Sequence, residues 1–164
     1  MKEKQLKKLL YIMALLCALC VTVMTVALCM PKEESAVFTP PPFEADAVRG
    51  VPTVDESLGY SEIYRQGMEF SALVCGNVTA DGLDAKVYFT NPAENTVWLK
   101  LRIMDAEGNI LGETGILKPG EYVECVTLAE ELCEGTKISL KIMAYEAETY
   151  HSEGAVILNT AIRK

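Results

Sequence analysis

The sequence predicts an all-β domain behind one N-terminal transmembrane helix. An uncharged apolar run extends from Leu9 to Met30, five of the seven prolines fall within residues 31–59, and short runs of alternating apolar and polar residues follow Tyr60. These observations divide the chain into four parts: a basic cytoplasmic tail at 1–8, a transmembrane helix at 9–30, a proline-rich extracellular linker at 31–59 and a β domain at 60–164.

The apolar run is long enough to remain as a membrane anchor. Its 22 residues form a helix of about 33 Å, which spans a hydrocarbon core of about 30 Å, whereas a signal-peptide core has about 7–15 residues. Length therefore favours a signal anchor, and cleavage at a weak small-x-small site near Ala27 is the alternative. Lysines at positions 2, 4, 7 and 8 predict a cytoplasmic N-terminus and an extracellular β domain at the cell membrane.

The linker contains three consecutive prolines, Pro40, Pro41 and Pro42. Proline fixes φ and lacks a backbone donor, so these residues predict a short stiff polyproline segment and neither a helix nor a central strand. A segment of this kind is usually a spacer, and a docking motif for an aromatic groove is the alternative.

Seven candidate strands follow the linker, each bounded by a turn signal. They cover residues 69–78, 86–91, 96–105, 110–117, 121–128, 137–146 and 155–162. The first two are separated by TADGLD, the third and fourth by AEGN, and the fourth and fifth by Pro119-Gly120, all typical of turns. AEELCEG, before the last two strands, predicts a single helical turn closed by Gly135.

Alternation is clearest in two of these strands. Apolar residues share one face at Val97, Leu99, Leu101 and Ile103, and again at Ile138, Leu140, Ile142 and Ala144. A period of two is typical of a half-buried strand. About seven such strands, with turns every 8–12 residues, favour an immunoglobulin-like antiparallel β-sandwich, and a small barrel is the alternative.

Turn motifs within the domain carry a family resemblance. They are the asparagine–proline turn in YFTNPAEN, the hairpin AEGNILGE, the Pro-Gly turn in KPGEYVE and the leucine-containing turn AEELCEG. With these motifs, residues 60–162 resemble uncharacterised small membrane-anchored immunoglobulin-like β-sandwich proteins of gut Gram-positive bacteria. The resemblance implies the same fold and an anchored location, and it implies no catalytic residues.

The part of the chain after the anchor is acidic. Residues 31–164 contain 11 basic and 22 acidic residues, a net charge of −11. Such a charge keeps a domain soluble and argues against nucleic acid as a partner.

No catalytic or cofactor motif appears in the sequence. A Gly-rich phosphate loop, HExxH and GxSxG are absent, and His151, the only histidine, lies in a predicted turn. We therefore expect no enzymatic activity, no cofactor and no metal. The acidic pairs at 81/84 and 105/107 offer a calcium alternative, but acids at hairpin tips usually serve the turn itself.

Three cysteines, Cys75, Cys125 and Cys133, follow the anchor. They allow at most one intramolecular disulfide, and their spacing is not that of a metal site. Cys125 alternates with Val123, so the pattern predicts that it is a buried strand residue.

One surface differs from this acidic background. If strand 96–105 lies beside strand 137–146, their outward faces bring together Trp98, Lys100, Arg102 and Met104 with Ser139, Lys141, Met143 and Tyr145. Aromatic, methionine and arginine side chains are common at the centres of protein interfaces. The alternative is an ordinary solvated sheet face with cross-strand pairs.

These features predict a non-catalytic, membrane-tethered extracellular module that binds another envelope or surface protein. The candidate binding residues are Trp98, Lys100, Arg102, Met104, Lys141, Met143 and Tyr145. The alternative is a structural or assembly subunit of a cell-surface or secretion apparatus that self-associates through edge strands. An envelope hydrolase has less support, because no nucleophile signature accompanies His151.

Overall fold

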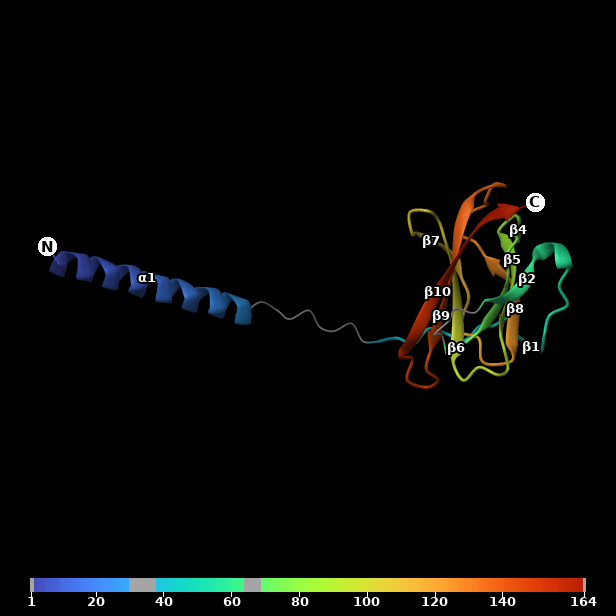
Figure 1. Cartoon of the computed structure of the whole chain (residues 1–164), viewed down its shortest axis with the longest axis horizontal. Helices are drawn as coiled ribbons and strands as arrows, with labels where there is room; N and C mark the ends of the chain where they lie inside the picture. The colour runs from blue at the N-terminus through green and yellow to red at the C-terminus, as the bar shows by residue number, and fades with distance from the viewer. Residues whose placement is uncertain (1, 30–37, 64–68, 164) are drawn as a thin grey trace. The chain divides into compact units, whose positions relative to one another are not determined.

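The computed structural model describes residues 2–29, 38–63 and 69–163. They fall into two compact units, Met1–Thr39 and Pro40–Lys164 (Figure 1). The first contains helix α1 (Lys2–Cys29), and the second, called the β unit below, contains the strands.

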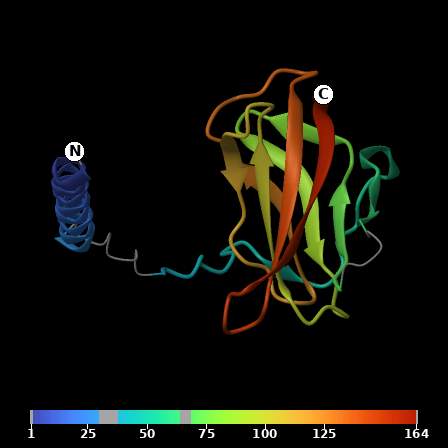
Figure 2. The same cartoon turned by 60° about the vertical axis from the view of Figure 1, so that its left-hand side comes forward.

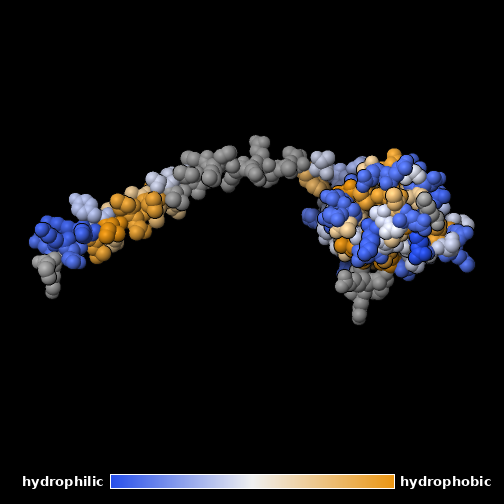
Figure 3. Space-filling view, turned by 90° about the horizontal axis from the view of Figure 1, so that it is seen from above, coloured by the Kyte–Doolittle hydropathy of each residue, from blue (hydrophilic) through white to orange (hydrophobic). Residues whose placement is uncertain are grey.

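Helix α1 confirms the predicted N-terminal apolar helix and begins earlier than expected, at Lys2. A window of 20 residues, Glu3–Thr22, is long and apolar enough to cross a membrane, a property that a signal sequence shares. Figure 3 shows polar side chains at the N-terminal end of this helix and apolar ones along the turns that follow. Met30 and residues 31–37 of the predicted linker lie outside the described residues.

The β unit is a mixed sheet of ten strands that curls strongly into a half-barrel (Figure 1). The strands are β1 (Val48–Arg49), β2 (Tyr60–Ile63), β3 (Ala72–Cys75), β4 (Val78–Asp81), β5 (Asp84–Asn91), β6 (Trp98–Met104), β7 (Ile110–Glu113), β8 (Glu121–Thr127), β9 (Lys137–Tyr145) and β10 (Ser152–Arg163). Their order is β1-β8-β5-β4-β10-β9-β6-β7, while β3 pairs with β5 and carries β2 on its other edge.

The predicted all-β character is confirmed, but the predicted antiparallel sandwich of about seven strands is not clearly present. The difference arises at β10, which pairs antiparallel with β9 and then reaches β4 in parallel, with Ile162 opposite Val78 (Figure 2). The Thr160 hydroxyl reinforces this junction by donating to the Gly76 carbonyl at 2.6 Å. One long strand thus joins strands that a sandwich would divide between two sheets.

The core confirms the predicted alternation. The eight apolar residues assigned to the inner faces are all buried: Val97, Leu99, Leu101, Ile103, Ile138, Leu140, Ile142 and Ala144. Val74, Val87 and Phe89 pack into the same cluster from β3 and β5. Period-two patterning therefore fixed the face of β6 and β9 correctly, because both strands run without a bulge where they pair with each other.

A bulge between β5 and β8 changes the position of Cys125. Val87 and Tyr88 of β5 lie between the paired positions Lys86 and Phe89, while β8 has only Glu124 between the corresponding partners. Tyr88 accordingly adopts a positive φ of 45°. The inward residues of β8 are Val123 and Val126, and Cys125 is only half-buried, so the predicted burial of Cys125 is wrong.

Residues 40–50, called the strap below, belong to the β unit and not to a free linker. The Pro42 carbonyl accepts from the Ile116 amide at 2.9 Å, and the Glu44 amide donates to the Ile116 carbonyl at 2.9 Å. Farther along, β1 pairs with β8. The compact unit therefore begins at Pro40, earlier than the predicted boundary at residue 60.

Candidate functional site

The candidate face is the outer side of β6 and β9. The two strands pair antiparallel as predicted, with Trp98 opposite Tyr145, Lys100 opposite Met143, Arg102 opposite Lys141 and Met104 opposite Ser139. These eight residues therefore share one side of the sheet, opposite the buried leucines and isoleucines.

The face is more covered than the sequence suggests. Lys100 and Met143 are buried, with exposed fractions of 4% and 8%, so the expectation that all of these side chains are open to solvent is wrong for these two. Trp98, Arg102, Met104, Lys141 and Tyr145 are half-buried. Part of this cover comes from the strap and from the β9–β10 turn, which the sequence predicted to be a linker and a turn.

The strap and the β9–β10 turn both contact Trp98. The Phe43 ring lies edge-on to the indole with centroids 5.0 Å apart, and the Tyr150 ring does so at 5.2 Å. Such edge-to-face pairs each contribute about 0.5–1.5 kcal/mol beyond burial. Lys118 Nζ lies 4.4 Å from the Phe43 ring centroid, a cation–π contact. We call Phe43, Trp98 and Tyr150 the aromatic cluster.

The turn that presents Tyr150 is tight. Glu148 and Tyr150 have positive φ values of 71° and 60°, which are uncommon for residues other than glycine. The Glu146 carboxylate holds the turn by accepting from the Thr149 hydroxyl at 2.6 Å, and it lies 3.6 Å from His151 Nδ1. His151 lies in this turn with its side chain 80% exposed, as the sequence predicts.

One carboxylate serves the two cations of β6. Glu113 of β7 lies 2.8 Å from Lys100 Nζ through Oε1 and accepts from Arg102 Nε at 2.7 Å through Oε2. Burial alone raises the pKa of Glu113, but the hydrogen bonds and charges of Lys100 and Arg102 outweigh it, so this pKa lies below its ordinary value. In contrast, no ion pair joins Lys141 to another described side chain.

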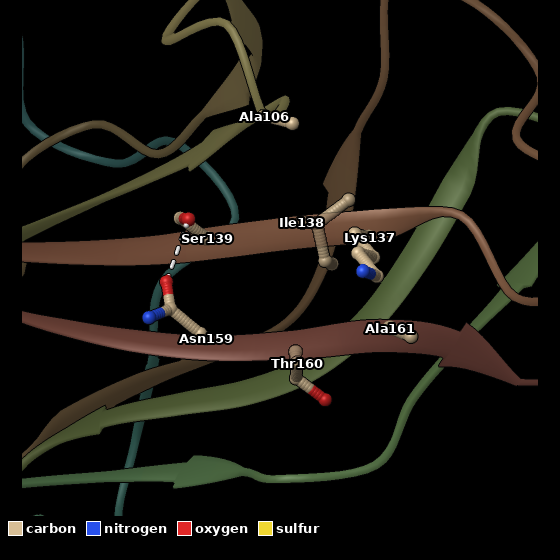
Figure 4. Close-up of a pocket in the computed structure, with 7 residues that line it drawn as sticks. All are labelled: Ala106, Lys137, Ile138, Ser139, Asn159, Thr160 and Ala161. Atoms are coloured by element: carbon tan, nitrogen blue, oxygen red, sulfur yellow. Dashed lines mark hydrogen bonds between the residues drawn. The ribbon is translucent and has the colours of Figure 1, made fainter.

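A shallow hollow lies at the end of β9 and β10 near the β6–β7 turn (Figure 4). It has a volume of about 450 Å³ and is lined by Ala106, Lys137, Ile138, Ser139, Asn159, Thr160 and Ala161. The Ser139 hydroxyl donates to Asn159 Oδ1 at 2.9 Å across its floor. These groups can offer polar contacts. Lys137 is the ionisable side chain among them, but the Ser139 hydroxyl bonds to the Asn159 amide and not to that amine.

The described residues contain no group of three or more histidine, cysteine or acidic side chains placed to hold a metal ion. Asp105, one of the calcium alternatives, instead closes its own turn by accepting from the backbone and side chain of Asn109, each at 2.7 Å. Cys75, Cys125 and Cys133 are free thiols. Burial raises the pKa of Cys75 to about 11, which keeps that thiol protonated and unreactive at neutral pH.

Sequence reasoning missed four contributors to this face: Phe43, Glu113, Lys118 and Tyr150. Glu113 was within reach, because the predicted 96–105/110–117 hairpin places its second strand beside Arg102, its observed partner. Phe43 offered a weaker signal, as an aromatic residue directly after three prolines.

Comparisons with protein families, curated proteins and solved structures find no match to this chain.

Proposed function

We propose that the chain is a non-catalytic, single-pass membrane protein whose β unit lies outside the cell and binds another envelope or surface protein. The apolar helix α1, preceded by lysines, supports the anchor and its orientation. The observation that carries the binding role is the aromatic cluster, which shares the outer face of β6 and β9 with Arg102 and Lys141 on a unit with 10 basic and 20 acidic residues.

The chemistry of the face suggests the kind of partner. Trp98, Tyr145 and Met104 are half-buried, so they offer apolar contact area at little further ordering cost. Lys141 is a cation without an ion-pair partner in the described part of the chain. A partner segment that combines an apolar or aromatic side chain with a carboxylate would match both features.

The proposal also includes a relationship of the β unit to the small membrane-anchored immunoglobulin-like proteins that its turn motifs resemble. The pairing of β6 with β7 and β9, and of β5 with β8, supports that relationship. The parallel pairing of β4 with β10 and the single curled sheet are the features that depart from it.

Site-specific photocrosslinking of the full chain in its native membrane tests the binding role. A photoreactive residue at Met104 should give a discrete adduct with one partner, whereas the same residue at exposed Lys86 of β5 should not. Lys141→Glu should weaken the Met104 adduct about tenfold or more, as expected when a charge at the centre of an interface is reversed.

The matched control is Lys86→Glu, which makes the same charge change on another part of the sheet and should leave the Met104 adduct unchanged. Equal adducts from Met104 and Lys86, or an adduct that Lys141→Glu does not affect, would contradict the proposal. The second candidate function, a self-associating assembly subunit, is favoured by a different feature: β9 pairs along one edge of β10, while on the other edge β4 pairs with it only at Ile162 and Arg163.

A further inference from the structure

Strand β10 has a partner along one edge only for most of its length. It pairs antiparallel with β9 from Ser152 to Ala161, and on its other edge β4 pairs with it only at Ile162 and Arg163. No other strand among residues 38–63 and 69–163 pairs with that second edge. We call the stretch 152–160 on this side the open edge.

The hydrogen bonds of Ile162 show which backbone groups point into the open edge. The Ile162 amide donates to the Thr136 carbonyl at 2.9 Å, and its carbonyl accepts from the Gly135 amide at 2.8 Å, so both groups of Ile162 face the β9 side. Backbone groups alternate sides along a strand. The N–H and C=O groups of Ala155, Ile157 and Asn159 therefore point away from β9, towards the open edge.

Glu153 is the one charged side chain along this edge. From Gly154 to Ile162 the sequence is GAVILNTAI, without charge or proline, and Ile157 is 54% exposed. Leu158 faces inward but is only partly buried. Natural sheets usually protect a long exposed edge with lysine, proline, a bulge or a covering segment.

The other edge strands follow that rule. Strand β1 has two residues, while β2 and β7 have four each and contain Glu62 and Glu113. At 12 residues, β10 is longer than most strands of globular proteins. Among the described strands, β10 is the long one whose edge is left open, and beyond the bulge at Ser152–Gly154 it carries no charge or proline as far as Ile162.

We propose that the open edge of β10 pairs antiparallel with β10 of a second copy of this chain, about a twofold axis near Val156. This register places Ala155 opposite Ile157 of the second copy and Glu153 opposite Asn159 of the second copy. The 155/157 pair uses residues whose backbone groups face the edge, as hydrogen-bonded antiparallel pairs require, while Glu153 is the extra residue of the bulge between Ser152 and Gly154. The register sets no like charges opposite each other and ends before the residues that β4 occupies.

Self-complementarity is the reason to choose a second copy as the occupant. A twofold pair uses the same patch on both subunits, so one edge with a single charge near its end serves both partners. The interaction differs from the proposed partner binding because it uses the backbone edge of β10. Ile157 lies opposite Lys141 of β9, so the pairing is tested on the purified chain, without a partner present.

Sedimentation of the purified full chain in detergent tests the pairing. The wild type should form a dimer that dissociates on dilution, and Ile157→Lys should raise its dissociation constant at least tenfold without altering the thermal melt. Ile110→Lys is the matched control, because Ile110 is 49% exposed on edge strand β7. A wild type that is monomeric at every concentration, or equal effects of both lysine variants, would overturn the proposal.

Crosslinking tests the register independently of any folding defect. Chains carrying Ala155→Cys and Ile157→Cys, with different tags, should join through a short thiol-reactive crosslinker more efficiently than Ala155→Cys chains join one another. The wild-type chain provides the background from the native cysteines. A dimer held together by α1 would show no preference for the 155/157 combination, and that result would also overturn the proposal.

Discussion

Lys100 is buried on the outer side of the sheet, and its ammonium lies 2.8 Å from the carboxylate of Glu113. Glu113 is thus the counter-charge of a lysine that water barely reaches, and it also accepts from Arg102. Removing one partner of such a pair is costly, because the remaining charge stays buried without compensation.

Glu113→Gln should therefore lower the free energy of unfolding by about 1–3 kcal/mol, less than for a fully buried pair because Glu113 is partly exposed. Chemical denaturation of the purified chain measures the change. Adding Lys100→Met to Glu113→Gln should recover much of the loss. Glu107→Gln, on an exposed turn, should shift stability by less than about 0.5 kcal/mol, and equal effects of the two glutamine variants would contradict this role.

The same carboxylate should make stability depend on acid pH. Burial opposes ionisation of Glu113, yet Lys100 and Arg102 hold its folded-state pKa below the ordinary value of 4.5. A lowered folded-state pKa stabilises the fold above the unfolded pKa, and this contribution is lost as pH falls through the folded pKa. When the melting temperature is measured from pH 7 to pH 3, it should begin to decrease at about pH 4.5. Glu113→Gln should make that decrease smaller.

Asn91 should be among the least replaceable polar residues. Its side chain is fully buried, donates to the carbonyls of Val97 and Leu117 at 3.0 and 2.9 Å, and accepts from Asn95 at 2.7 Å. Asn91→Ala removes all three hydrogen bonds and leaves the Val97 carbonyl without this donor, while the Leu117 carbonyl keeps the Leu99 amide, so we expect a loss of about 2–4 kcal/mol in a thermal melt. Asn109→Ala, in an exposed turn, should cost less than half as much, and the reverse order would refute this account.

Phe43→Ala should loosen the strap more than the rest of the β unit. The substitution removes the edge-on contact with Trp98 and the cation–π contact with Lys118. Hydrogen exchange at the Glu44 and Ile116 amides should become about tenfold faster, which corresponds to about 1.4 kcal/mol of local opening. Val51→Ala, at an exposed position just beyond the strap, should leave these rates unchanged. Unaltered exchange in the Phe43 variant would show that the contact does not hold the strap.

The bulge in β5 makes a prediction about two neighbouring positions of β8. Val126→Asp should destabilise the β unit by several kcal/mol, because Val126 is 2% exposed and an unpaired carboxylate would enter the core. Cys125→Asp should be milder, since Cys125 is half-buried and its partner across the ladder is Lys86. Thermal melts of both variants test this register. A larger effect of Cys125→Asp than of Val126→Asp would show that Cys125 faces the core, as strict alternation from Val123 predicts.

The sequence predicted those elements whose evidence is local. Alternation identified the inner faces of β6 and β9, and turn signals separated most of the strands, because strand period and turn chemistry depend on neighbouring residues. The bulge at Tyr88 and the parallel junction of Ile162 with Val78 depend on residues distant in sequence. A pattern read along one strand contains no information about such partners.

The candidate site was likewise predictable only where the evidence is local. Trp98, Arg102 and Lys141 could be placed on one face, because two alternating strands define it. Their covering residues, Phe43 and Tyr150, come from segments without periodicity, so neither the covering of Trp98 nor the burial of Lys100 was predictable from pattern.

The parallel junction between β4 and β10 also has a consequence for the order of folding. β10 is synthesised after every other strand of the sheet. The β4–β5 hairpin and β9 are therefore made before the strand that pairs with both β4 and β9. Until then β4 and β9 each present an edge that the finished sheet occupies. Such exposed edges make an incomplete chain prone to aggregation, and pairings distant in sequence slow folding to milliseconds or seconds. The edges of β4 and β9 are therefore protected from other chains only once β10 has paired with both of them.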